Sequence, residues 1–137
     1  MKHAPVVVTV TVVVAALFGA ALFGGACAHM YGKDDLDVSV FQHNVNLRWG
    51  RLDNAALTVK PEMRGPFVAA WTARMQQLEI QDIEVGGVAL SKDGDAADVS
   101  VAVTFVDKAS MTVRTETVGE HWIRTDDGWL IDKPAQL

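Results

Sequence analysis

The spacing of apolar residues changes once along the chain, near Leu78, and this change constrains the fold more than any other feature. Between residue 38 and Leu78, apolar residues recur every three or four positions, which is typical of helices that bury one face. After Leu78 they alternate with polar residues, which is typical of strands with one buried face. Segregated helices and strands predict an α+β domain in which the helices cover one face of a sheet.

Two helical regions are expected. The first has an apolar stripe at spacings of four, four and three residues, formed by Phe41, Val45, Trp49 and Leu52. We expect this stripe to be buried and His43, on the opposite side of the helix, to be exposed. The second region starts near Pro66, which suits the first turn of a helix, and has a stripe formed by Phe67, Trp71, Met75 and Leu78.

Turn-forming clusters at residues 92–95, 107–110 and 126–128 divide the second half of the chain into four strands. Alternation is most regular from Val99 to Phe105. The pair Gly86-Gly87 shifts the alternating phase, which predicts a β-bulge. The expected architecture is a curved four-stranded antiparallel meander with the N-terminal helices packed on it.

An apolar leader precedes this domain. Residues 5 to 28 carry no charge, Lys2 lies before them, and small residues end the run, as in an export signal. If the positively charged N-terminal segment stays in the cytosol, the rest of the chain lies outside it. We therefore divide the chain into a leader (1–27), a tether (28–37) and an α+β domain (38–137).

Three fates of the leader remain open. The residues Gly24-Gly25-Ala26-Cys27 resemble a bacterial lipobox, although Leu is usual where Gly24 stands, so Cys27 would become the lipid-modified N-terminus. Ala28 after it would favour delivery to the outer membrane, facing the periplasm. The small residues around Cys27 also fit ordinary signal peptidase, and the apolar run is long enough to remain as a membrane anchor. We adopt lipidation, because Cys27 is the only cysteine and lies where the apolar run ends.

Composition excludes several classes of function. A net charge of −5 argues against nucleic-acid binding, which depends on a basic surface. One cysteine excludes an intrachain disulfide, and the four histidines lack the spacing of metal ligands. Phosphate-binding glycine motifs are missing from the sequence. We therefore expect no metal and no cofactor.

Three stretches carry a resemblance to a known family: Leu47-Arg48-Trp49 with Ala55-Ala56, Pro61-Glu62 with Phe67, and Glu120-His121-Trp122-Ile123-Arg124-Thr125-Asp126-Asp127-Gly128-Trp129-Leu130-Ile131. Through these stretches the chain resembles the NTF2-like superfamily, the cone-shaped α+β fold shared by nuclear transport factor 2, ketosteroid isomerase and many small bacterial lipoproteins. The resemblance covers roughly residues 36 to 135. The helical part is shorter than usual. The resemblance implies a curved sheet around a conical cavity, and a reduced form of the fold.

Enzymes of this superfamily pair an Asp base with a Tyr or acidic donor, and that set is incomplete here. The only tyrosine, Tyr31, lies in the tether. Asp82 and Asp98 alternate with apolar residues on strands, so a solvated strand face is the better interpretation. His121 neighbours Glu120, but adjacent strand residues face opposite sides of a sheet, so Glu120 cannot orient it. We assign no catalytic residue.

If a ligand pocket exists, we expect it to be reached by Arg48, Trp49, Trp71, Arg114 and His121. For Arg114, a surface pair with Glu116 is the competing interpretation. The expected function is a non-enzymatic, lipid-anchored envelope domain that binds a protein partner or a small apolar ligand. The alternatives are an NTF2-like isomerase or dehydratase, and a structural subunit of a membrane assembly anchored by its apolar leader.

Overall fold

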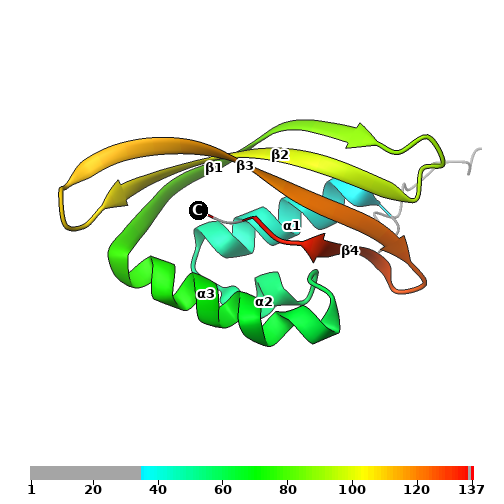
Figure 1. The fold of residues 1–137 in the computed structure, drawn as a ribbon, viewed down its shortest axis with the longest axis horizontal. Helices are drawn as coiled ribbons and strands as arrows, with labels where there is room; N and C mark the ends of the chain where they lie inside the picture. Colours follow the sequence, from blue (N-terminus) through cyan, green and yellow to red (C-terminus); the bar gives the residue numbers. More distant parts are fainter. Residues whose placement is uncertain (1–34, 136) are drawn as a thin grey trace, which may run out of the picture. The chain divides into compact units, whose positions relative to one another are not determined.

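A computed structural model describes residues 35–135 and residue 137, so the predictions for the leader and Cys27 lie outside the described residues. The elements follow the predicted order (Figure 1), as α1 (Leu36–Arg48), α2 (Leu52–Ala56), the short 3-10 helix η1 (Pro61–Met63), α3 (Arg64–Gln77), β1 (Leu78–Leu90), β2 (Ala96–Asp107), β3 (Thr112–Thr125) and β4 (Gly128–Lys133). Helix α1 begins at Leu36, inside the segment assigned to the tether. In the described ranges, no helix is long and apolar enough to cross a membrane.

The four strands form one antiparallel sheet in the order β1-β2-β3-β4, which confirms the predicted meander. The sheet curves over the helices, which lie on one of its sides (Figure 1). The register of β1 against β2 shifts twice, between Ile80 and Asp82 and between Val85 and Gly87. The second shift includes Gly86, where the sequence predicts a bulge.

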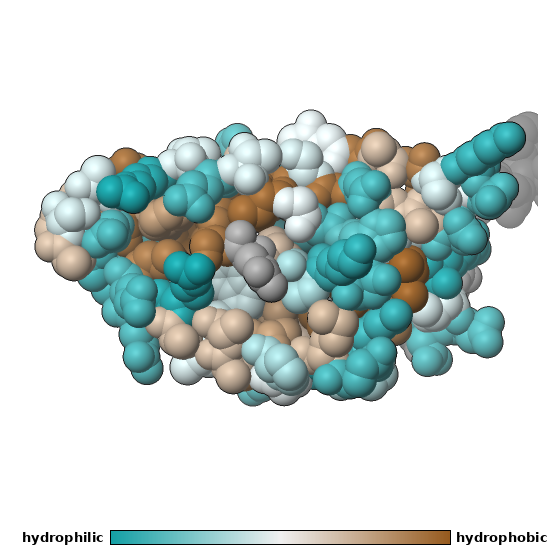
Figure 2. Space-filling view, viewed as in Figure 1, coloured by the Kyte–Doolittle hydropathy of each residue, from teal (hydrophilic) through white to brown (hydrophobic). Residues whose placement is uncertain are grey.

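The core lies between the helices and the inner face of the sheet. Strand β2 contributes every second residue to it, namely Ala97, Val99, Val101, Val103 and Phe105, all buried. Helix α3 contributes Phe67 and Trp71, as its predicted stripe requires, with Met75 partly buried beside them. Figure 2 shows apolar side chains inside a hollow between the sheet and the helices.

The prediction for the buried face of the first helix is wrong. Phe41 and Trp49, expected in the core, are 65% and 66% exposed, whereas His43 is almost completely buried. Helix α1 ends at Arg48, and Gly50 follows with a φ of 66°, so the chain turns before the predicted stripe is complete.

A different stripe of α1 faces the sheet. Leu36, Val40 and Leu47 are buried on it, at helical spacing. His43 and Asn44 lie between them on the same face and are also buried. Two polar residues on the inner face made this stripe look solvent-facing in the sequence, because the apolar pattern alone favoured the aromatic side.

The two edges of the sheet differ. The edge strand β4 is covered by the chain itself, because residues around Val59 form a parallel bridge to Ile131. The backbone N–H of Lys60 donates to Ile131 O at 3.0 Å, and the N–H of Ile131 donates to Thr58 O at 2.7 Å. Among the described residues, no segment pairs with the outer edge of β1 in this way.

Candidate functional site

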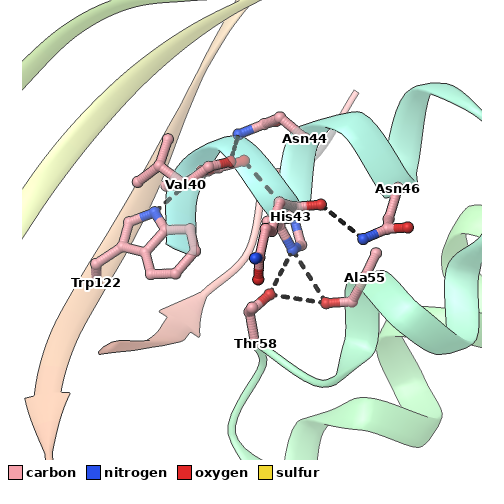
Figure 3. A network of polar contacts seen from close by, with 9 residues as sticks. Val40, His43, Asn44, Asn46, Ala55, Thr58 and Trp122 are labelled. Carbon is pink, nitrogen blue, oxygen red and sulfur yellow. Dashed lines mark hydrogen bonds and ion pairs between the residues drawn. The ribbon is translucent and has the colours of Figure 1, made fainter. Parts of the chain in front are cut away.

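Three polar side chains are buried together between α1 and the inner face of the sheet, and Figure 3 shows the two that come from α1, His43 and Asn44. His43 and Asn44 come from α1, and Glu120 comes from β3; His43 and Glu120 are each 1% exposed. Glu120 pairs in register with Val99, a buried residue of the inner face, and therefore points toward the helices. We call these residues the buried polar cluster.

The hydrogen bonds of His43 assign its tautomer. Its Nδ1 lies 3.1 Å from the carbonyl oxygen of Ala55 and 2.8 Å from Thr58 Oγ1. Because a carbonyl can only accept, we assign the ring proton to Nδ1, which leaves a lone pair on Nε2. Burial lowers the pKa of His43 from 6.5 to about 4, and the hydrogen bond to Ala55 opposes this only in part. The imidazole is therefore neutral near pH 7.

Glu120 has one satisfied oxygen and one free oxygen. Its Oε2 accepts a hydrogen bond from Trp122 Nε1 at 3.0 Å. Its Oε1 lies 3.8 Å from His43 Nε2, and neither Oε1 nor Asn44 Oδ1 has a hydrogen-bond partner among the described residues. The amide nitrogen of Asn44 donates one of its two protons to Val40 O at 3.0 Å.

Burial raises the pKa of Glu120 from 4.5 to about 7, although the neighbouring side chains of Trp122 and Asn44 oppose the rise. A protonated Glu120 has an O–H donor on the side of Oε1, which faces the lone pair of His43 Nε2 at 3.8 Å. A proton held on Glu120 is thus the arrangement that best satisfies the cluster, because buried polar atoms without partners are costly.

An opening of about 240 Å³ lies between α3 and the C-terminal residues. Its walls are formed by Ala70, Trp71, Arg74, Ala135 and Leu137. We call it the α3 opening. Its lining is mostly apolar and contains one cation, the guanidinium of Arg74.

A series of rings links the α3 opening to the buried polar cluster. The ring of His43 packs against Phe67 with 5.5 Å between centroids, and Phe67 packs against Trp71 with 6.4 Å between centroids. On its other side, His43 meets Trp122 edge-on at 5.8 Å. A ligand that displaces Trp71 would therefore also displace His43, which faces Glu120, because the ring of Phe67 packs between them.

The structure does not gather the five predicted pocket residues. Trp71 lines the α3 opening. Arg48 instead forms an ion pair with Asp82, 3.1 Å between Nη1 and Oδ1, and its guanidinium lies 5.5 Å from the ring centre of the exposed Trp49. Arg48 and Trp49 are both exposed, so neither belongs to the core.

The other two predicted residues lie on opposite faces of the sheet. Arg114 pairs in register with the buried Phe105, so it belongs to the inner face, yet it is exposed because the β2–β3 hairpin extends beyond the helices (Figure 1). His121 lies on the outer face, where its Nδ1 is 2.6 Å from Asp98 Oδ1 and its Nε2 is 4.0 Å from Asp132 Oδ1. The expectation that Glu120 and His121 face opposite sides is confirmed.

The buried polar cluster was missed at the sequence level, although the sequence contains a signal for it. Glu120 alternates with Val118 and Trp122, and this period of two assigns it to the apolar face of the strand. A carboxylate on an apolar face requires a partner, which the opposite layer must supply. His43 and Asn44 occupy that layer.

Chemically, the cluster can hold a proton but cannot reach a substrate from where it lies. A general acid must come within hydrogen-bond distance of the reacting group, whereas His43 and Glu120 are buried under Trp122, Phe67 and the sheet. In the part of the chain that the structure describes, no three His, Cys, Asp or Glu side chains are grouped to hold a metal ion.

Comparison with known proteins identifies the fold. No protein-family model matches the sequence, and no curated protein matches it significantly. A SEC-C motif containing protein from Rhodopseudomonas palustris is similar in structure, with a TM-score of 0.62 and 14% identity over 80% of this chain and 83% of that one. A ketosteroid isomerase-like protein from Erwinia carotovora atroseptica is similar with a TM-score of 0.53 and 13% identity over 72% of this chain and 94% of that one.

At these identities the likeness concerns the fold, and it agrees with the helices, the meander and the curved sheet described above. The described part of the chain has the NTF2-like fold, in a form with four strands.

Proposed function

We propose that this chain is a non-catalytic binding domain that holds a small amphiphilic ligand, with an apolar body and one anionic group, in the α3 opening. The observation that carries the proposal is the lining of that opening, where Trp71 and Leu137 offer apolar surface beside the guanidinium of Arg74. Ligand sites in proteins have this composition, an apolar wall with a few polar groups that fix orientation. At about 240 Å³ the opening is smaller than the roughly 300–1,000 Å³ of drug-sized sites, so the ligand is small.

Arg74 supports an anionic group in the ligand. No ion pair joins its guanidinium to a carboxylate in the described ranges, so its charge is available to a ligand. A guanidinium binds carboxylate or phosphate oxygens with two parallel hydrogen bonds, which orients an anionic head while the tail contacts Trp71.

Burial of the acid–base groups supports binding rather than catalysis. The carboxyl with a raised pKa, Glu120, and its neighbour His43 are shielded from the α3 opening by Phe67 and Trp71. The exposed His121–Asp98 pair lies on the other face of the sheet. An isomerase or dehydratase would require one of these groups inside the opening.

The ligand proposal is tested with the full chain in lipid nanodiscs and with 8-bromooctanoate, whose bromine quenches tryptophan on contact. We expect saturable quenching that is lost in Trp71→Phe, which keeps an aromatic ring in the wall. Arg74→Glu should weaken binding at least tenfold, because it replaces attraction by repulsion. The uncharged probe 8-bromooctanol should bind the wild type more weakly and should not discriminate between wild type and Arg74→Glu.

Arg51→Glu is the matched control, since Arg51 is exposed, directly precedes α2 and does not line the α3 opening. It should leave the affinity for 8-bromooctanoate unchanged. Quenching that survives Trp71→Phe, or that responds equally to the two charge reversals, would show that the probe does not bind in the α3 opening.

The leader supports a proposal about location. We propose that Cys27 becomes a lipid-modified N-terminus and holds the domain at the outer membrane, facing the periplasm, where apolar ligands are concentrated at the bilayer surface. Mass spectrometry of the chain from a Gram-negative host tests it. A diacylated Cys27 at the mature N-terminus is expected. An intact Met1 would instead indicate an uncleaved anchor, and an unmodified cleaved N-terminus would indicate a soluble protein.

A further inference from the structure

The outer edge of β1 is unprotected only in its last residues, from Gly87 to Leu90. Covering segments, charged side chains, proline and β-bulges are the usual means by which proteins prevent strand pairing at an edge, and the bulges and acidic residues of β1 all lie before Gly87. The residues around Val59 cover β4, but β1 spans 13 residues with neither lysine nor proline among them. Beyond the bulge, β1 pairs regularly with β2 from Gly87 to Leu90, so its opposite edge presents ordered N–H and C=O groups there.

Apolar side chains accompany this edge. Val85, Val88 and Leu90 are 44%, 42% and 60% exposed, although Val85 and Val88 pair with buried residues of the inner face. Helix α1 packs against β1 and runs antiparallel to it (Figure 1), and it presents the exposed Phe41 to solvent. We call Val85, Val88 and Leu90 with their backbone the β1 edge. Exposed apolar groups on a free strand indicate an interface.

The distribution of charge along β1 indicates which partner strand can pair with the β1 edge. The first half is acidic, with Glu79, Asp82 and Glu84, whereas residues 85 to 91 are uncharged and Lys92 follows. Glu84 and Lys92 are both exposed, and no ion pair involves either of them in the described part of the chain.

We propose that the β1 edge pairs with the β1 edge of a second copy of this chain. Two antiparallel strands related by a twofold axis at Val88 place their uncharged halves opposite each other. The same arrangement brings Glu84 of each copy near Lys92 of the other, so two ion pairs flank the apolar centre. Parallel pairing would align the acidic halves of the two strands, which costs free energy.

Pairing through the β1 edge leaves the ligand site open. The walls of the α3 opening come from α3 and the C-terminal residues, and none of them belongs to β1 or α1. Dimer formation and ligand binding are therefore separable, and the failure of one proposal does not decide the other.

Disulfide cross-linking tests the position of the axis. The full chain with Val88→Cys is oxidised in membranes of the expression host, where the wild type with its native Cys27 is the control for the only other cysteine. Directly opposite residues of an antiparallel pair lie about 4.5–5.5 Å apart between Cα atoms, within the range of a disulfide. We expect a covalent dimer from Val88→Cys. We expect none from the wild type or from Asp126→Cys, an exposed residue of the β3–β4 turn.

Charge exchange tests the partner. In the Val88→Cys background, Glu84→Lys should lower the cross-linking yield roughly tenfold, because both flanking attractions become repulsions. Adding Lys92→Glu should restore the yield, since the exchanged charges again complement each other across the twofold axis. Glu116→Lys is the matched control: Glu116 is exposed on β3, away from the β1 edge, and its reversal should leave the yield unchanged.

Three outcomes would overturn the proposal. One is a yield from Asp126→Cys equal to that from Val88→Cys, which indicates random collision. Another is a yield that Glu84→Lys does not change or that Lys92→Glu does not recover. The third is a Val88→Cys adduct with a host protein instead of a second copy, which would assign the β1 edge to a different partner.

Discussion

Replacing Glu120 by glutamine tests the protonation state of the buried polar cluster. The amide has nearly the shape of the acid but cannot ionise. Its oxygen can accept the hydrogen bond that Trp122 Nε1 donates to Oε2 at 3.0 Å. Its NH₂ group can point toward the lone pair of His43 Nε2, as the O–H of the protonated acid would in the wild type. Glu120→Gln thus mimics the protonated wild type at every pH.

The size of the effect follows from the pKa of Glu120. That pKa is about 7 in the folded protein and 4.5 ordinarily, so folding favours the protonated carboxyl. The contribution of Glu120 to stability is therefore complete below pH 4.5 and is lost as the pH rises through about 7. Between these limits the loss is about 3 kcal/mol. We expect the free energy of unfolding of Glu120→Gln, relative to the wild type, to increase by about 3 kcal/mol from pH 4 to pH 8.

Urea unfolding of the full chain, followed by tryptophan fluorescence at several pH values, measures this difference. All four tryptophans lie between residues 49 and 129, so the signal reports the folded domain. His43 titrates in both proteins and cancels in the comparison. Glu116→Gln, the same change at an exposed position of β3, should show a difference that varies little with pH. A pH-independent difference for Glu120→Gln, or one that falls as the pH rises, would refute a proton held on Glu120.

Three further predictions concern the same region. Burial holds the pKa of His43 at about 4, below its ordinary 6.5, so the free energy of unfolding falls as the pH falls between these values. Urea titrations should show that the wild type loses about 3 kcal/mol more stability between pH 7 and pH 4 than His43→Leu, which has no imidazole to protonate. Trp122→Phe deletes the donor to Glu120 Oε2 and should cost about 1–3 kcal/mol by urea unfolding, with a larger cost at pH 8 than at pH 5. Leu47→Ala should cost about 2–5 kcal/mol by thermal unfolding, whereas Phe41→Ser should change stability by only about 0.5 kcal/mol. A larger cost for Phe41→Ser than for Leu47→Ala would show that the aromatic stripe of the helix is the buried one.

The sheet and the last helix were predictable because local signals agreed there with the global fold. A turn signal separates each strand from the next, and the alternation from Val99 to Phe105 matches the observed inner face. The stripe of α3 begins with Phe67 and Trp71, and both are buried. At Gly86 even the position of the bulge followed from the sequence.

The first helix and the candidate site were not predictable from apolar spacing. Helix α1 offers two stripes with helical spacing, and the one with aromatic residues is the more apolar. The fold buries the other because His43 and Asn44 meet groups from distant segments, Glu120 on β3 and Thr58 after α2. A polar residue on an inner face depends on a partner that only the tertiary structure supplies.

The parallel bridge between Val59 and Ile131 limits where a strand can be added to this sheet. It occupies the outer edge of β4, so no further strand can be added there. β4 in turn pairs with β3 only from His121 to Thr125, so among the described residues the first half of β3 keeps an unpaired edge on that side of the sheet. A few backbone hydrogen bonds near Lys60 thus direct any added strand to β1 or to the first half of β3.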